Sequence, residues 1–202
     1  MSLIINHSQK WGYLHIPKTG GTSLTKLLLN VDNSEEIITH GDLGNFGNIS
    51  NYFIFTFVRN PFTRIASAYQ HNVRSGNASN FKNFLESISP INFWYFPQIY
   101  FINHNSKEGR TINYIGKYEN YTTDINYILN TLKIPIQELP NENRNPIFNR
   151  HPQLNDMDYY KILYKDSWCK DWVLERYKND FKFFNYELDI WRTIYNRTFR
   201  YA

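Results

Sequence analysis

The spacing of hydrophobic positions along the chain predicts short strands that alternate with helices. Strands are expected over Trp11–Ile16, Glu35–His40, Tyr52–Val58 and Thr111–Tyr118. The third run, YFIFTFV, is almost wholly apolar, as in a central strand that is covered on both faces. This alternation is typical of an α/β fold with a mainly parallel sheet, in which ligands bind at the carboxyl ends of the strands.

Helices are expected between these strands. Pro17–Thr22 interrupts the first strand, and a helix is predicted over Ser23–Leu29. Asn60 and Pro61 are the residue types favoured at a helix N-cap and at the first helical position, so a helix should run from there to about Asn72. The remaining predictions are two helices, an amphipathic tail helix and one irregular segment: Asn80–Ile88, Thr123–Leu132, Ser167–Phe181 and Pro135–Pro152.

Composition fits a single globular domain over residues 1–202, with 42% hydrophobic and 20% charged residues. The aromatic content of 18% is high, and we attribute it to a coding bias. The net charge of +4 suits an anionic ligand, but Lys and Arg are scattered along the chain. A nucleic-acid-binding protein would usually show them clustered, so no nucleic-acid partner is expected.

The cellular environment is predicted from three features. Cys169 is the only cysteine, which excludes an intramolecular disulfide. Residues Met1–Lys10 lack the apolar core of a signal peptide, and no apolar run approaches the length of a membrane span. We therefore expect a soluble, cytoplasmic protein with no membrane span.

The segment from His15 to Ser23, HIPKTGGTS, follows a predicted strand and opens a predicted helix. Gly20 and Gly21 would let the backbone approach an anion closely. The amides from Gly20 to Ser23 would face the anion at a helix N-terminus, and Lys18 would add a mobile positive charge. Because Lys18 precedes the glycines, this is not a Walker A loop. The alternative is a plain strand-to-helix turn.

A second motif, FVRNPFTRIASAY, spans Phe57–Tyr69. Arg59 lies at the end of the central strand, and Ser67 lies about two turns into the next helix. A guanidinium binds a phosphate through two hydrogen bonds, and a serine on the helix face nearest the strand end would share that phosphate. The alternative is a buried arginine that pairs with a carboxylate, together with an incidental helical serine.

Together these motifs resemble those of the PAPS-dependent sulfotransferases, and most closely the carbohydrate sulfotransferase branch (PAPS is 3′-phosphoadenosine-5′-phosphosulfate). That family carries a His-x-Pro-Lys-x-Gly-Gly-Thr-Ser-like loop and a Val-Arg-Asn/Asp-Pro-x-x-Arg-x-x-Ser-Ala-Tyr segment in the same order and spacing. Weaker matches are Tyr114–Glu119 and the tail Glu175–Tyr186. The resemblance covers most of the chain from Trp11 to Tyr186, but only the first two motifs are specific, and only in combination.

The resemblance implies a P-loop-like, three-layer α/β fold with a mainly parallel sheet, PAPS as sulfuryl donor and PAP as product. Arg59 and Ser67 would hold the 3′-phosphate, and Arg64 would be structural, bridging helix and sheet. Related animal enzymes are anchored in the Golgi, and because no anchor is seen here we expect a bacterial or viral protein. The 5′-phosphosulfate would be held by the loop residues Lys18, Thr19, Gly20, Gly21, Thr22 and Ser23.

The expected reaction is an in-line displacement with a loose transition state. Lys18 and the loop amides would stabilise charge on the leaving nucleotide, and no metal is expected because a sulfuryl group carries less charge than a phosphoryl group. His40, which follows a predicted short strand where related enzymes often carry a histidine, is the candidate general base. Asp42 is the alternative base or an orienting group, and His15 is expected to be an ordinary buried histidine.

The resemblance suggests that the acceptor is a hydroxyl on a glycan or glycoside. We favour a core role over sugar stacking for the aromatic stretch Asn92–Phe101, and a solvated loop over ligand contact for Arg144 and Arg150. Three other functions stay open: an ATP-dependent P-loop kinase, a non-catalytic nucleotide-binding module and a nucleic-acid-binding domain. The kinase would need magnesium and an acidic residue at the strand end, where Arg59 stands.

Overall fold

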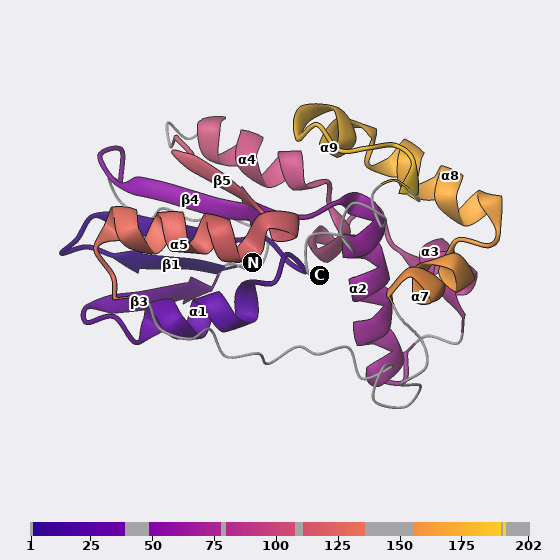
Figure 1. Cartoon of the computed structure of the whole chain (residues 1–202), viewed down its shortest axis with the longest axis horizontal. Coiled ribbons are helices and arrows are strands. Elements are labelled where there is room, and N and C mark those ends of the chain that lie inside the picture. Colours follow the sequence, from indigo (N-terminus) through magenta and orange to yellow (C-terminus); the bar gives the residue numbers. More distant parts are fainter. Residues whose placement is uncertain are drawn as a thin grey trace. The chain divides into compact units, whose positions relative to one another are not determined.

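The computed structural model describes residues 2–38, 49–77, 80–107, 111–135, 156–190 and 192. The chain folds into two compact units (Figure 1). Unit 1 comprises Met1–Arg59 and Gln98–Glu142, and unit 2 comprises Asn60–Pro97 and Asn143–Ala202. The single domain expected over residues 1–202 stays a prediction.

Unit 1 is built on a five-stranded sheet with the strand order β3-β1-β2-β4-β5. Strands β2, β4 and β5 pair in parallel, whereas β1 pairs antiparallel with both β2 and β3. One strand, β1, therefore runs opposite to the other four, and the predicted α/β sheet with a parallel centre is confirmed. The strands are β1 (Ser2–Asn6), β2 (Trp11–His15), β3 (Ser34–Ile38), β4 (Phe53–Val58) and β5 (Tyr114–Lys117).

Strand β1 was missed in the sequence because its three apolar residues stand next to polar ones. The structure explains why polar Asn6 ends a fully buried strand. Its side-chain oxygen accepts hydrogen bonds from the Ser8 hydroxyl and the Gln9 amide, both at 2.8 Å, and its amide donates to the Asp32 carbonyl at 2.9 Å. Asn6 thus organises the hairpin between β1 and β2, and its burial leaves no polar atom unsatisfied.

Both faces of the sheet in unit 1 are buried. One face packs against helices α1 (Gly21–Leu29) and α5 (Tyr121–Leu132) through a shared cluster of strand aromatics and helix aliphatics. The other face is covered as well, because Leu14 and Ile54 on the middle strands are fully buried. This confirms that β4 is a central strand buried on both faces. Helix α4 (Gln98–Lys107) and the 3-10 turn η2 (Tyr118–Asn120) complete the unit; a three-layer arrangement stays a prediction.

Unit 2 is helical within the part of the chain that the structure describes. Its core is largely aromatic, with the Phe62 ring 5.3 Å from Tyr164 and 5.1 Å from Phe181, measured between ring centroids. Much of the unusual aromatic content is therefore used in packing. The elements are α2 (Pro61–Arg74), α3 (Phe81–Ser87), η1 (Phe93–Tyr95), α7 (Asp156–Leu163), α8 (Ser167–Arg176) and α9 (Lys178–Phe183).

The amphipathic helix predicted over Ser167–Phe181 is wrong, because two helices, α8 and α9, stand there with a break at Tyr177. Tyr177 has φ −113° and ψ 20°, and its ring is buried. Its hydroxyl donates to the Tyr95 carbonyl at 2.9 Å. This contact with a distant segment accompanies a break that local helix propensity does not reveal.

The aromatic stretch Asn92–Phe101 is not the core segment that we expected. Trp94 is 41% exposed and Tyr100 is 43% exposed, whereas Phe101 is buried. The stretch divides between η1 and the start of α4, two elements that the sequence did not indicate. Its aromatic rings therefore reach the surface at two separate positions.

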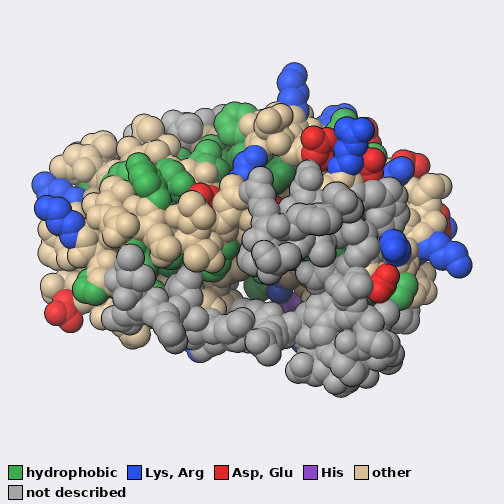
Figure 2. Space-filling view, viewed as in Figure 1, with side chains coloured by type: hydrophobic (Ala, Val, Ile, Leu, Met, Phe, Trp, Pro, Cys, Tyr) green, Lys and Arg blue, Asp and Glu red, His purple; other side chains and the backbone are tan. Residues whose placement is uncertain are grey.

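The face of the molecule drawn in Figure 2 carries basic side chains at several separate places. This matches their scatter along the sequence. Within the described residues, no helix is both long enough and apolar enough to cross a membrane.

The N-cap of α3 at Asn80 can be tested by substitution. Its side chain accepts a hydrogen bond from the Asn83 amide at 2.9 Å and caps α3. Asn80→Ala should lower the free energy of unfolding by about 1 kcal/mol, because one amide of the first turn loses its partner. Urea denaturation followed by circular dichroism would measure this loss. Asn80→Asp keeps the acceptor and should match the wild type; equal losses in both variants would contradict the capping role.

Candidate functional site

The candidate site lies in unit 1, at the carboxyl ends of the parallel strands β2, β4 and β5. The loop after β2, Arg59 after β4 and Tyr118 after β5 meet at this edge of the sheet. Arg59 Nη1 donates to the Lys18 carbonyl at 3.4 Å, and Arg59 Cζ lies 4.2 Å from the centroid of the Tyr118 ring. The prediction that both motifs lie at the carboxyl ends of strands is confirmed. The structure adds that the loop and Arg59 are in contact and that Tyr118 lies beside them.

The loop between β2 and α1 turns sharply through two left-handed residues. Lys18 has φ 69° and Gly20 has φ 86°. Between them, Thr19 is fully buried and its hydroxyl donates to the Ile16 carbonyl at 2.8 Å. The Thr19 side chain thus holds the turn together from within, so its hydroxyl is engaged inside the loop.

Gly20 and Gly21 are required by internal packing. A Cβ on Gly20 would stand 2.6 Å from Tyr118 Cε2, and one on Gly21 would stand 2.3 Å from His15 Nε2 and 2.5 Å from the Tyr13 hydroxyl. Real Cβ atoms do not come this close to neighbouring atoms. The structure thus gives a packing reason for both glycines. That they also let an anion approach the backbone stays a prediction.

The N-terminus of α1 faces this loop without a capping side chain. Its N-cap residue is Gly20, which makes no side-chain hydrogen bond, and its first turn holds no acidic residue. Helices α2 and α8, by contrast, are capped by Asn60 and Asp166. The first amides of an α-helix lack partners within the helix and carry the positive end of its dipole. This end of α1 is therefore suited to an anionic group.

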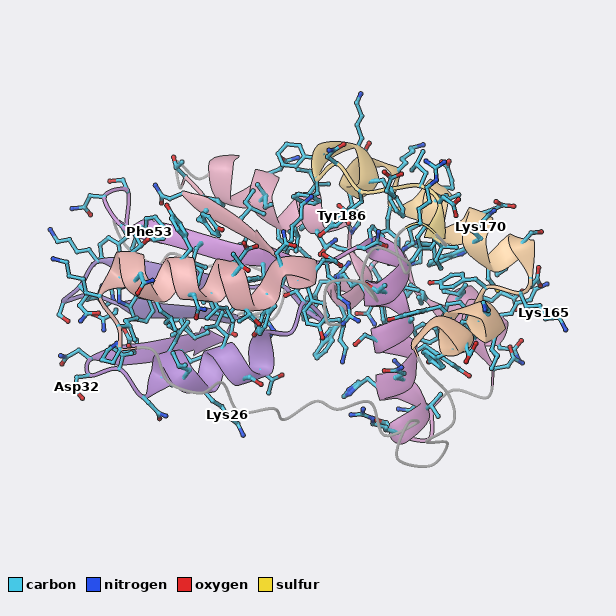
Figure 3. All side chains as sticks on the ribbon, viewed as in Figure 1. Lys26, Asp32, Phe53, Lys165, Lys170 and Tyr186 are labelled. Carbon is cyan, nitrogen blue, oxygen red and sulfur yellow. The ribbon has the colours of Figure 1, made fainter. Side chains whose placement is uncertain are left out.

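Two lysines belong to the loop and the helix, and their positions differ. Lys18 stands in the loop itself, next to the N-terminus of α1. Lys26 lies in the last turn of α1, is exposed and points away from the sheet (Figure 3). Of the two, Lys18 is the one that lies at the N-terminal end of the helix, where an anion would bind.

Arg59 is fixed by its main chain as well as by its side chain. Its amide donates to Gln98 Oε1 and its carbonyl accepts from Gln98 Nε2, both at 2.8 Å. Gln98 is fully buried, and Arg59 is only 8% exposed. No sequence signal pointed to Gln98, because a single glutamine that starts a helix carries no pattern of its own.

Tyr121, in the first turn of α5, also contacts the loop. Its hydroxyl donates to the Gly20 carbonyl at 2.7 Å. Burial and the neighbouring Tyr118 hydroxyl raise the pKa of Tyr121, so the hydroxyl stays a neutral donor at working pH. The Tyr114–Glu119 match in the sequence indicated this region of the chain but not the role of either tyrosine.

His15 and Tyr13 lie beneath the N-terminus of α1, with their rings stacked at 5.8 Å between centroids. His15 is partly exposed, so the expectation of a buried histidine is only partly met. Burial, assisted by the charge of Lys18, lowers the pKa of His15 to about 4. The imidazole is therefore neutral at pH 7. Burial raises the pKa of Tyr13 well above its ordinary value.

Other predicted residues fall in unit 2. Ser67 is half-buried on α2. Arg64 is buried and donates to the Phe96 carbonyl at 2.9 Å and to the Trp94 carbonyl at 3.2 Å. These bonds agree with a structural role for Arg64, but they tie α2 to the segment around η1, whereas we had expected a tie between helix and sheet.

Several sequence predictions cannot be placed in the structure. His40, Asp42, Arg144 and Arg150 lie outside the described residues. Among the residues that are described, no group of His, Cys, Asp and Glu side chains is arranged to hold a metal ion.

Comparison with known proteins identifies one family. A family model described as the sulfotransferase family matches residues 1–187. No curated protein and no solved structure matches the chain significantly. The resemblance inferred from the two motifs is confirmed at the level of the family, and the match does not distinguish its carbohydrate branch.

Two matched glycine substitutions can distinguish the effect of the Gly20–Tyr118 contact on stability from the effect of backbone strain. Gly76 also has a positive φ, 73°, but no atom lies within 4 Å of the position of its Cβ. Gly76→Ala should therefore cost about 1 kcal/mol of unfolding free energy through strain alone. Gly20→Ala should cost about 2–4 kcal/mol, because the clash with Tyr118 adds to the strain. Similar losses in urea denaturation would show that the ring does not confine the loop.

Because the pKa of His15 is lowered, the free energy of unfolding should fall as the pH becomes acidic. Between pH 6.5 and about 4 the unfolded chain binds a proton that the folded chain excludes, so this contribution is fully present above pH 6.5 and is lost as the pH falls. The loss should reach at most about 3 kcal/mol at pH 4. His15→Gln should remove this loss, and urea denaturation of both proteins from pH 7 to 4 would test it. Unfolding free energies that fall equally with pH in both proteins would contradict the prediction.

Proposed function

This chain belongs to the sulfotransferase family, and from that premise we propose that it transfers the sulfuryl group of PAPS to a hydroxyl acceptor. Family membership makes the chain a sulfotransferase; the donor, the acceptor class and the roles of individual residues are our proposal. The observation that supports the donor most strongly is the meeting of a Lys-containing loop, an uncapped helix N-terminus and Arg59 at one edge of the sheet.

PAPS has two anionic ends, and unit 1 presents a cationic group for each. We assign the 5′-phosphosulfate to the loop, where the first amides of α1, the Thr22 and Ser23 hydroxyls and Lys18 would donate hydrogen bonds. The left-handed turn at Lys18 and Gly20 sets the direction in which these amides point. Thr19 would contribute through its backbone, since its hydroxyl bonds to the Ile16 carbonyl.

We assign the 3′-phosphate to Arg59. The Arg59 guanidinium carbon lies 4.2 Å from the centroid of the Tyr118 ring, a cation–π contact that helps to orient the side chain. Gln98 holds the Arg59 backbone through two hydrogen bonds, so the main chain that carries the Arg59 side chain is fixed in position. Ser67 remains a proposed second donor to this phosphate, as the resemblance implies.

In the proposed mechanism, Lys18 and the loop amides stabilise the negative charge that develops on the departing nucleotide oxygen. A base takes the proton of the acceptor hydroxyl during the in-line displacement. We propose His40 for this role. His15 is less suited to it, because a pKa of about 4 makes its imidazole a weaker base than an ordinary histidine. Magnesium is not required in this scheme, because the sulfuryl group carries less charge than a phosphoryl group.

We propose a hydroxyl of a glycan or glycoside as the acceptor. The support comes from the resemblance to the carbohydrate branch and from the exposure of Trp94 and Tyr100. Exposed aromatic faces offer an apolar surface with a polar edge, which suits a sugar ring. This reverses our expectation that the stretch belongs to the core, and it makes sugar stacking available at either residue.

The donor can be tested by titrating the protein with PAP in a calorimeter without magnesium, and with ATP plus magnesium for comparison. We expect PAP to bind more tightly than ATP. Arg59→Ala should weaken PAP binding about 10–100-fold, because a charged hydrogen-bonding group is lost from a buried position. Lys178→Ala is the control, because it removes one positive charge from an exposed position on α9 and should leave PAP affinity unchanged.

Two results would contradict the proposal. Binding of ATP with magnesium, in the absence of PAP binding, would favour the P-loop kinase. PAP binding that Arg59→Ala does not weaken would leave PAPS as the donor but would remove Arg59 from the site. Turnover of PAPS with simple glycosides, followed by release of PAP, would then test the acceptor class.

A further inference from the structure

The register of the sheet brings Tyr118 beside Arg59. Strands β4 and β5 are parallel, and Val58 is paired with Lys117 at their ends. The next residue along each strand is Arg59 on one side and Tyr118 on the other, so the two leave the sheet as neighbours. The 4.2 Å distance between Arg59 Cζ and the Tyr118 ring centroid follows from this register.

The Tyr118 ring is confined by the loop as well as by Arg59. Its Cδ2–Cε2 edge packs on Gly20, where an added Cβ would stand 2.7 Å from Cδ2 and 2.6 Å from Cε2. The Tyr121 ring lies 5.6 Å from it between centroids, and the Tyr121 hydroxyl bonds to the Gly20 carbonyl. Arg59 Nη1 also reaches the Lys18 carbonyl. Tyr118 therefore fills the space between the loop and the arginine.

A guanidinium held over an aromatic ring is attracted by the negative face of the ring. This contact restricts the rotation of the Arg59 side chain, so less freedom is lost when an anion binds. An aliphatic side chain of similar size would fill the space but would not attract the cation. The orientation of the arginine therefore depends on the ring.

On the basis of the proposed function, we infer that Tyr118 is the positioning residue that orients Arg59 toward the 3′-phosphate, and that it thereby sets the preference for 3′-phosphorylated nucleotides. Tyr121 acts differently, because its hydroxyl bonds to the loop that serves the 5′ end. Both rings lie against the loop, but the Tyr118 ring also contacts the Arg59 guanidinium, so we assign the effect on the 3′ end to Tyr118.

The test compares the dissociation constants of PAP and 5′-AMP, which differ only in the 3′-phosphate, by calorimetry on the full chain. Tyr118→Leu should weaken PAP binding about tenfold, the size expected for losing a desolvated cation–π contact, and should change AMP binding less than about twofold. Tyr118→Phe keeps the ring and should preserve both constants. Tyr118→Met, which also lacks a ring, provides a second variant if Tyr118→Leu fails to fold, and should give the same loss of discrimination.

A double-mutant cycle separates positioning from a general structural role. If Tyr118 acts through Arg59, adding Tyr118→Leu to Arg59→Ala should not weaken PAP binding further. Tyr121→Phe, which removes only the bond to the loop, should weaken PAP and AMP by the same factor. An equal effect of Tyr118→Leu on both nucleotides, or a full effect in the absence of Arg59, would overturn the inference.

The outcome for the wild type distinguishes this inference from the proposed function. A wild-type protein that binds PAP no better than AMP would overturn the assignment of a 3′-phosphate site, and this inference with it. A wild-type protein that prefers PAP, with a Tyr118→Leu variant that keeps the preference, would overturn the inference alone.

Discussion

The parallel pairing of β2, β4 and β5 is the constraint on which the site depends. Because the three strands run in one direction with a fixed register, the loop after β2, Arg59 after β4 and Tyr118 after β5 emerge at one edge of the sheet. The antiparallel strand β1 extends the sheet on the far side of β2, and its first residue, Ser2, pairs with His15 at this edge. The direction and register of the strands thus determine where the cationic groups lie, and side-chain contacts determine how these groups are oriented.

The packing around the loop explains why so many aromatic residues surround the proposed anion site. Four rings, those of Tyr13, His15, Tyr118 and Tyr121, surround the two loop glycines. A loop that is held by its own protein in this way pays little ordering cost when a ligand binds. Burial of Arg59 has a desolvation cost, and its contacts with the Lys18 carbonyl and the Tyr118 face offset part of it.

The sequence predicted what local chemistry determines. The loop, the N-cap at Asn60 and the central strand β4 were found because each is encoded within a few consecutive residues. Gln98, Tyr118 and the break at Tyr177 depend on partners that are distant in the chain, and no local pattern marks them. The packing role of the two glycines was not predicted, because the rings around Gly20 belong to Tyr118 and Tyr121, which are distant in the chain.

The charge state of the loop bears on how the activity would depend on pH. Lys18, Arg59 and the N-terminus of α1 all favour an anion. His15 stands among them, and a protonated imidazole there would add a further positive charge to the loop. Because burial keeps its pKa near 4, that charge is largely absent between about pH 5 and 8. A pH dependence of turnover in this range would then have to come from groups other than His15, the base that activates the acceptor among them.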